Sequence, residues 1–232
     1  IECSRLLRHR GPDWSGIYHH QHAILVHERL AIVGTENGAQ PLYNEDKSHI
    51  LAVNGEIYNH QKLAQGLTSD YAFKTGSDCE VILPLFQEHG TDFIDKLEGM
   101  FAFCLFDETN NRYLIARDHI GIIPLYTGYD EDGHFYVASE MKALMPLCKT
   151  VSEFPPGHFL DSQIGEVKPY YKRNWKQYSA VKDNTTSKVK LREALEEAVK
   201  SHLMTDVPYG VLLSGGLDSS LISAITQKFA AR

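Results

Sequence analysis

The chain has 232 residues, a formal net charge of −7, and 43% hydrophobic against 23% charged residues. This length allows one large domain, or one domain and part of another, and the composition is that of a soluble globular protein. The acidic balance without a Lys/Arg-rich run argues against a nucleic-acid partner, and no apolar stretch reaches the roughly 20 residues of a membrane span.

The N-terminal stretch IECSRLLRHRGPD contains no apolar core of a secretory signal peptide, and part of it is typical of the end of a helix. Because the chain starts with Ile1, we expect further residues in front of it. The four cysteines lie far apart without a C-x-x-C pair, which indicates reduced thiols; they are Cys3, Cys79, Cys104 and Cys148. These features predict a cytoplasmic protein.

Residues 1–171 are rich in short β-type segments. Two hairpins are predicted between aromatic and branched runs, with turn residues 107–111 and 130–133. A helix is expected from Asp78 to Gly90, where apolar residues recur on one face, and a second helix over 139–147. Sheets with helices segregated from them predict a layered α+β domain.

Residues 172–187 are polar and lack hydrophobic periodicity, which predicts a linker. The next stretch, from 188, places an apolar stripe on a helix, made of Leu191, Leu195, Ala198, Val199 and Leu203. Pro208 and Gly210 end this helix before a predicted strand, Val211 to Leu213. Helix, strand, loop and helix over 188–232 are typical of the start of an α/β nucleotide-binding domain.

The stretch YGVLLSGGLDSSLISAI, residues 209–225, has the layout of a phosphate site. Gly215 and Gly216 allow a tight turn that brings backbone N–H groups close to an anion. Asp218, Ser219 and Ser220 stand where a helix begins and are expected to cap it. No Lys follows the glycines, so this is no Walker A loop. A capped strand-to-helix turn would explain SGG alone.

The longer string LLSGGLDSS resembles the pyrophosphate loop of the ATP pyrophosphatases. This resemblance implies ATP binding and AMP transfer with release of pyrophosphate. It assigns the ATP contacts to Leu212, Ser214, Gly215, Gly216, Leu217, Asp218 and Ser219. It also implies that Asp218 holds Mg²⁺ through the pyrophosphate.

Five stretches nearer the N-terminus carry convergent polar groups: RHRGPD, HERLAIV, NGEIYNH, TGSDCE and RDHIGIIPLY. Each alone has a structural explanation: Arg29 as a surface ion-pair partner, Asn54-Gly55 as a hairpin turn, and Asp78 as a helix N-cap. In this order they resemble the class II glutamine amidotransferases over residues 1 to 165.

Glutamine hydrolysis needs the residue types found in these stretches. The α-carboxylate of glutamine needs a bidentate cation, which Arg29 can supply, and the α-ammonium needs a carboxylate, which Asp78 can supply. The tetrahedral intermediate needs preorganised donors, which the Asn54 amide and the Gly55 N–H can form. The resemblance implies that Glu56 and the backbone from Arg29 through Leu30, Ala31, Ile32 and Val33 complete the glutamine pocket.

A class II glutaminase followed by SGGLDSS resembles the glutamine-hydrolysing asparagine synthetases of the bacterial B type. The strings RHRGPDWSGIY, LAVNGEIYNHQ, TGSDCEVIL and SEMKAL carry this resemblance, which covers the whole chain. It implies an N-terminal-nucleophile αββα sandwich over 1–171, a linker over 172–187 and the start of an ATP-pyrophosphatase domain over 188–232.

The implied activity is that of a carbon–nitrogen ligase of amino-acid biosynthesis. Ammonia from L-glutamine would react with L-aspartate that magnesium ATP has adenylated, giving L-asparagine, glutamate, AMP and pyrophosphate. The resemblance favours a cytoplasmic homodimer without a nucleic-acid or membrane partner. Another glutaminase-coupled adenylating ligase, such as a β-lactam synthetase, and a non-catalytic glutamine-binding remnant stay open as alternatives. SGGLDSS argues against a sugar-transferring glutaminase.

The nucleophile of this family is an N-terminal cysteine. Cys3 lies directly before RHRGPD, at a helical position where the family has an apolar residue. We therefore interpret Cys3 as a small buried hydrophobe and not as the nucleophile. We expect the nucleophile to lie ahead of Ile1 and the aspartate-binding residues beyond Arg232, so that the chain as written lacks glutaminase activity.

Overall fold

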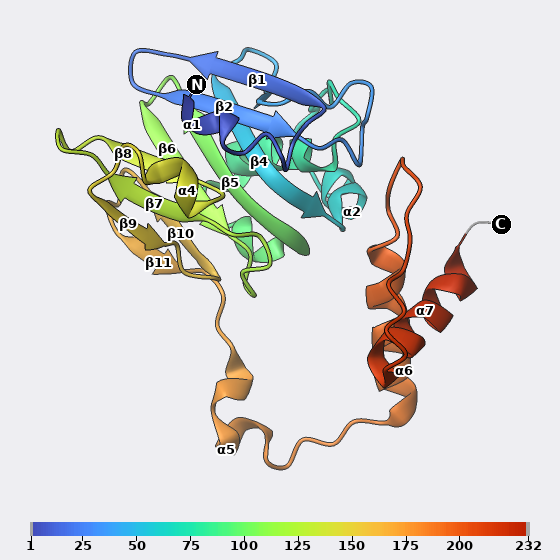
Figure 1. Cartoon of the computed structure of the whole chain (residues 1–232). Coiled ribbons are helices and arrows are strands. Elements are labelled where there is room, and N and C mark those ends of the chain that lie inside the picture. The colour runs from blue at the N-terminus through green and yellow to red at the C-terminus, as the bar shows by residue number, and fades with distance from the viewer. Residues whose placement is uncertain (1, 231–232) are drawn as a thin grey trace. The chain divides into compact units, whose positions relative to one another are not determined.

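The structure, a computed structural model, describes residues 2–230. It divides into two units, Ile1–Tyr171 and Lys172–Arg232, which are described separately (Figure 1). Within the described residues, no helix combines the length and hydropathy of a membrane span.

A six-stranded antiparallel sheet forms the centre of the first unit (Figure 1). Its strands, from one edge to the other, are β11 (Val167–Pro169), β10 (His158–Asp161), β6 (Arg112–Arg117), β5 (Gly99–Asp107), β4 (His49–Ile57) and β3 (Leu42–Tyr43). The predicted hairpin with turn residues 107–111 is confirmed, since Asp107 pairs with Arg112. Asn111 takes the left-handed conformation that this turn requires, with φ 46°.

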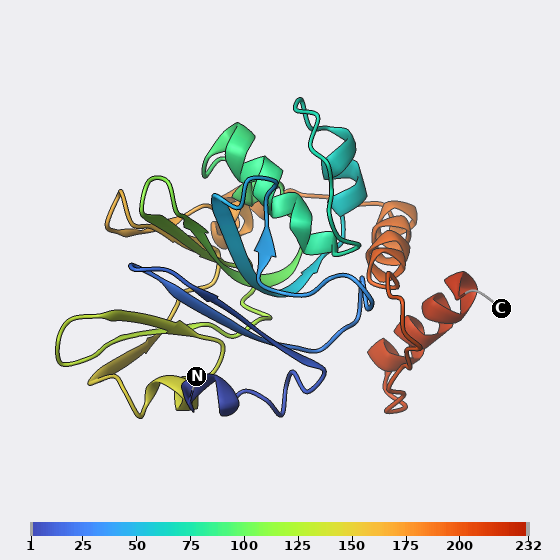
Figure 2. The same ribbon diagram turned by 90° about the horizontal axis from the view of Figure 1, so that it is seen from above.

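Helices cover one face of this sheet (Figure 2). They are α2 (His60–Gln65), the 3₁₀ helix η1 (Asp78–Val81), α3 (Ile82–His89) and the 3₁₀ helix η2 (Ile94–Lys96). The predicted helix from Asp78 to Gly90 is thus a 3₁₀ turn that continues as α3, and Gly90 ends it with φ 59°. The apolar face of α3 packs with Phe93, Phe101 and Phe103 in the main core.

Two smaller sheets cover the opposite face. One pairs β1 (Trp14–His19) with β2 (Ile24–Arg29), and the other has the order β8 (Phe135–Ala138), β7 (Tyr126–Tyr129), β9 (Thr150–Glu153). Leu25 packs against Ile50 and Phe106 of the large sheet, and Leu125 packs in a cluster with Ile115.

The short helices α1 (Glu2–Arg5) and α4 (Met141–Leu144) contact one another and the small sheets. Figure 2 shows the resulting order of layers, helices, sheet, sheet and helices. The predicted αββα sandwich is therefore confirmed. The helix expected over 139–147 is shorter than predicted.

The second unit is helical. It contains the 3₁₀ helix η3 (Asn174–Lys176), α5 (Tyr178–Val181), α6 (Lys188–Ser201) and α7 (Leu217–Phe229). Ser187 caps α6 by accepting a hydrogen bond from the N–H of Lys190 at 3.1 Å. The prediction of a strand from Val211 to Leu213 is wrong for this structure. A strand needs a neighbour for its backbone hydrogen bonds, and no described segment of this unit pairs with these residues.

Candidate functional site

The predicted glutamine-site residues lie around one cavity of the first unit. Its volume is about 1330 Å³. All but Ala31 of the predicted residues line it: Arg29, Leu30, Ile32, Val33, Asn54, Gly55, Glu56 and Asp78. They come from the ends of β2 and β4, the segment after β2 and the start of η1, so the fold gathers stretches of sequence that lie far apart.

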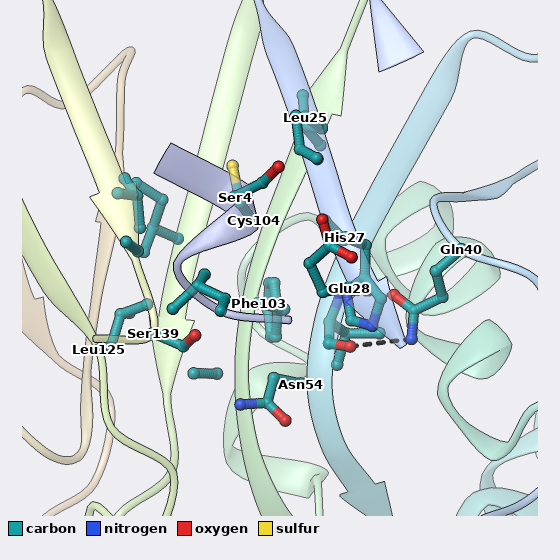
Figure 3. A pocket seen from close by; sticks show the side chains of 18 of the residues that line it. Ser4, Leu25, His27, Glu28, Gln40, Asn54, Phe103, Cys104, Leu125 and Ser139 are labelled. Atoms are coloured by element: carbon teal, nitrogen blue, oxygen red, sulfur yellow. Dashed lines mark hydrogen bonds between the residues drawn. The ribbon is translucent and has the colours of Figure 1, made fainter. Parts of the chain in front are cut away.

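The end of β4 provides the first wall of the cavity. Asn54 lies opposite Ala102 of β5, and Figure 3 shows its side chain among those that line the cavity. Gly55 has φ 136°, and a Cβ atom there would lie 2.0 Å from the backbone oxygen of Met100. Only glycine fits this position, so Asn54-Gly55 belongs to a strand with a local distortion and not to a hairpin turn.

Asp78 provides a buried negative charge beside this wall. Its side chain is almost fully buried, and its Oδ2 accepts a hydrogen bond from the N–H of Ile57 at 2.6 Å. Burial raises the pKa of Asp78, although this hydrogen bond opposes the shift. The N-cap of η1 is Ser77, whose Oγ accepts from the N–H of Cys79, so the interpretation of Asp78 as an N-cap is wrong.

Glu56 brings a second carboxylate close to Asp78. Burial raises the pKa of Glu56, and the negative charge of Asp78 adds to this rise. A cation bound beside these carboxylates would favour their ionised forms. The arrangement therefore favours an ammonium group as ligand.

Arg29 provides the buried positive charge. It is 8% exposed, and its interpretation as a surface ion-pair partner is wrong. Its Nη2 donates to the backbone oxygens of Gly34 at 2.7 Å and Val33 at 3.2 Å, and its Nη1 donates to that of Thr35 at 3.3 Å. The turn after β2 thus wraps around the guanidinium, whose pKa is lowered by burial.

The RHRGPD stretch holds the segment that follows Arg29. Asp13 accepts a hydrogen bond from the N–H of Ala31 at 2.9 Å, and its own N–H donates to the backbone oxygen of Arg29. A Cβ atom at Gly11 would lie 2.0 Å from the backbone oxygen of Glu28, so this close approach requires glycine. These contacts give the stretch a supporting role.

Three further residues of the cavity and its surroundings were not predicted from the sequence. His27 lines the cavity beside Gln40, and burial together with the charge of Arg29 lowers the pKa of His27 to about 4 (Figure 3). Gln40 exchanges two hydrogen bonds of 2.8 Å with the backbone of Val53. Glu80 is fully buried and accepts hydrogen bonds from the loop before Asp78. His27 lies in the motif HERLAIV and Glu80 lies in TGSDCE. Nothing in these strings indicates the contacts that the two side chains make.

Three of the four cysteines have environments that disfavour a reactive thiolate. Burial raises the pKa of Cys104 to about 12, and it also raises the pKa values of Cys79 and Cys148. Cys3 lies in α1 at the edge of the cavity, where it is partly buried.

The predicted phosphate loop lies in the second unit and is exposed. Leu212 and Leu217 are 94% and 83% exposed. Gly215 has φ 85°, and α7 starts after Gly216 without a side-chain cap, which corrects the expected capping by residues 218–220. The hydroxyl groups of Ser214 and Ser219 lie 2.9 Å apart. The loop thus presents hydroxyl groups and the uncapped N-terminus of a 13-residue helix on one short segment.

Comparison with known proteins identifies two family models along the chain. Residues 1–163 match a glutamine amidotransferase domain, and residues 190–232 match asparagine synthase. The glutamine-hydrolysing asparagine synthetase B of Escherichia coli is 67% identical over 232 residues, which is 100% of this chain and 42% of that protein. A probable asparagine synthetase of Dictyostelium discoideum is 51% identical over 236 residues, covering 99% of this chain and 42% of that protein. The chain spans less than half the length of these relatives.

Among solved structures, the glutamine phosphoribosylpyrophosphate amidotransferase of Bacillus subtilis is similar. The TM-score is 0.51 at 30% identity, over 62% of this chain and 34% of that one. This similarity agrees with the layer order of the first unit.

Proposed function

The chain belongs to the glutamine amidotransferase domain family, and we propose that its first unit binds L-glutamine as the nitrogen donor for the synthesis of L-asparagine. One observation carries this proposal: a buried cation, Arg29, and a buried carboxylate, Asp78, line one cavity together with Asn54 and Gly55. The α-carboxylate and α-ammonium of an amino acid need a cation and a carboxylate as partners, which Arg29 and Asp78 provide. The carboxamide of glutamine needs hydrogen-bond donors in the same cavity, which Asn54 and Gly55 provide.

Each group has a defined task in the proposed site. Arg29 binds the α-carboxylate of glutamine, and its longest contact, to Thr35, is the one that a carboxylate replaces most easily. Asp78 and Glu56 bind the α-ammonium. Asn54 and the N–H of Gly55 stabilise the oxyanion of the tetrahedral intermediate, and Leu30, Ala31, Ile32 and Val33 complete the wall.

The proposed nucleophile is none of the four cysteines of this chain. Attack on the carboxamide carbon needs a thiolate, and burial opposes thiolate formation at Cys79, Cys104 and Cys148. Cys3 is partly buried in α1, a helix that contacts α4, and we interpret it as a small apolar group of this helix. Attack forms a thioester with loss of ammonia, and water then releases glutamate.

The loop of the second unit is proposed to bind ATP. Leu212, Ser214, Gly215, Gly216, Leu217, Asp218 and Ser219 would contact the phosphates. The exposed carboxylate of Asp218 at the start of α7 fits Mg²⁺, which favours one carboxylate together with substrate phosphates. In the whole protein, the aspartate β-carboxylate attacks the α-phosphorus and displaces pyrophosphate. Ammonia then attacks the acyl carbon and displaces AMP. The cytoplasmic location and the homodimer rest on the resemblance alone.

The glutamine site is tested by calorimetric titration of the chain with L-glutamine. We expect Arg29→Lys and Asp78→Asn each to weaken binding about tenfold or more, because each removes one charge-assisted contact. Glu166→Gln, at an exposed ion pair remote from the cavity, is the control with unchanged affinity. Equal affinities in all four proteins, or no binding to the unaltered chain, would overturn the glutamine proposal.

The synthetic reaction needs a separate test on a protein that has the full length of the relatives. Incubation with aspartate, magnesium ATP and glutamine is expected to yield asparagine and AMP in equal amounts. Formation of AMP without asparagine would indicate a different acceptor and would refute the asparagine proposal.

A further inference from the structure

Two loops flank the opposite charges of the proposed glutamine site, in addition to the strands that carry Arg29 at the end of β2 and bond Asp78 to Ile57 of β4. Arg29 is enclosed by the turn after β2, residues 33–38, and Asp78 follows directly on the loop of residues 71–77. Neither loop takes part in a sheet. The position of one loop relative to the other therefore depends on side-chain and backbone contacts between the loops and their neighbours.

The loop before Asp78 is organised by Glu80. The carboxylate of Glu80 is 0% exposed and accepts the N–H groups of Lys74 and Thr75, each at 2.7 Å, as well as the hydroxyl groups of Thr75 and Tyr71. Thr75 Oγ1 in turn accepts the N–H of Ser77 at 3.1 Å. The loop is thus tied to the same 3₁₀ helix that carries Asp78, because Glu80 lies two residues after it.

The turn around Arg29 is organised by glycine contacts. Gly34 accepts hydrogen bonds from Arg29 Nη2 and from the N–H of Gly38, both at 2.7 Å. A Cβ atom at Gly38 would lie 2.6 Å from Arg29 Nη2. The position of this turn and that of the guanidinium are therefore coupled.

A hydrogen bond joins the two loops. The N–H of Gly76 donates to Oδ1 of Asn37 at 2.8 Å. Next to this bond the backbones are in close contact, since a Cβ atom at Gly34 would lie 2.8 Å from the carbonyl carbon of Gly76. The side chain of Asn37 itself is exposed and lies outside the set of residues that line the cavity.

We propose that the Asn37–Gly76 contact, backed by Glu80, sets the spacing between Arg29 and Asp78, so that Asn37 and Glu80 are positioning residues for the α-amino acid head group. This inference rests on the proposed glutamine site. Asn37 and Glu80 would thus make the site selective for ligands that carry both an α-carboxylate and an α-ammonium, although neither residue touches these groups. A ligand without the ammonium uses only the Arg29 side and is insensitive to the spacing.

The test compares two ligands on four forms of the chain. L-glutamine and glutaramate, which lacks the α-ammonium, are titrated into the unaltered chain, Asn37→Ala, Asn37→Asp and Glu36→Ala. We expect Asn37→Ala to weaken glutamine binding about fivefold, the effect of one neutral hydrogen bond, and to leave glutaramate binding unchanged. Asn37→Asp keeps the acceptor oxygen and restores glutamine affinity. Glu36→Ala, an exposed neighbour in the same turn, has no effect.

A second readout separates this inference from the glutamine proposal. Amide hydrogen exchange of residues 74–80 is expected to accelerate in Asn37→Ala and to stay at its original rate in Asn37→Asp and Glu36→Ala. Failure of the unaltered chain to bind glutamine, with exchange accelerated as expected, refutes the glutamine site but supports the coupling of the loops. Unchanged exchange at 74–80, or an equal loss of affinity for both ligands, overturns the positioning role.

Discussion

The two units hold their functional side chains in different ways. In the first unit, the proposed site consists of buried charges tied to distant parts of the chain, as Asp78 is to Ile57 and Gly76 to Asn37. In the second unit, the contacts of the phosphate loop are local, such as that between Ser214 and Ser219. Local contacts can form from a short sequence alone, whereas the buried site exists only in the folded sandwich.

The two units also differ in how deeply their side chains are buried. Aromatic side chains such as Phe93 and Phe103 are at most 1% exposed in the first unit. Among the described residues of the second unit, only Val199, Ile225 and Thr226 are buried. We expect the first unit to unfold cooperatively and helices α6 and α7 of the second unit to be held weakly.

The largest expected effect comes from the aromatic core. The ring of Phe103 stacks on those of Phe93 and Phe101, at centroid distances of 6.2 and 5.8 Å. Phe103→Ala leaves a cavity and is expected to lower the free energy of unfolding by about 4 kcal/mol. Amide hydrogen exchange should accelerate across β5 and β6 and stay unchanged in α6. Equal acceleration in α6 would contradict independent stability of the units.

The next comparison is between a buried ion pair of the first unit and an exposed set of ion pairs in the second unit. Asp161 and Arg112 form an ion pair with side chains 3% and 19% exposed, whereas Glu196 pairs with Arg192 and Lys228, which are 73% and 49% exposed. Asp161→Ala leaves a poorly solvated guanidinium and is expected to cost about 3 kcal/mol, seen as a lower urea midpoint. Glu196→Ala is expected to leave the midpoint unchanged, because solvent screens its partners. A similar decrease of the urea midpoint in both variants would show that burial does not distinguish the two ion pairs.

The first unit should also be acid-sensitive through His27. Burial, followed by the charge of Arg29, lowers the pKa of His27 from 6.5 to about 4. Between these pH values the unfolded chain binds more protons at this residue than the folded chain. The contribution of neutral His27 to the free energy of unfolding is therefore present above pH 6.5 and is lost as the pH falls towards 4, by about 3 kcal/mol.

His27→Gln isolates this contribution from the carboxyl groups that titrate nearby. Urea unfolding of the unaltered chain and of this variant, each near neutral pH and again in mild acid just above the folded-state pKa of His27, should show a smaller loss of stability in the variant. Parallel losses in the two proteins would show that another group causes the acid sensitivity.

The smallest effect is expected in the phosphate loop. Gly215 has φ 85°, and a Cβ atom added there would meet no other atom within 4 Å. Gly215→Ala therefore adds backbone strain of about 1 kcal/mol and no clash. Because the loop is exposed, the free variant can relax out of the left-handed turn and then pays the strain on binding. Its affinity for magnesium ATP, measured by calorimetry, should therefore fall about fivefold. Gly210→Ala is the control, because Gly210 lies outside the proposed ATP contacts, has no positive φ, and a Cβ atom there would meet nothing within 4 Å. Equal effects of the two substitutions would argue against a role for the left-handed turn.

Local features of the fold could be predicted from the sequence. The hairpin turn before Arg112, the end of α3 at Gly90 and the start of α6 after Ser187 all depend on residues within one turn of each other. The residue types of the site could also be predicted, since charges and amides of glutamine chemistry appear in five recognisable stretches.

The tertiary structure decided how those residues are used. Asp78 is a buried carboxylate instead of the predicted cap, and Arg29 is enclosed by backbone oxygens. Val211 to Leu213 find no strand partner within residues 2–230. The tertiary structure also brought Asn37 to Gly76, 39 positions apart. Short-range patterns record which side of a segment is apolar and where it turns. Burial, pKa and contacts between loops depend on the path of the whole chain, because they arise only when distant segments exclude water from one another.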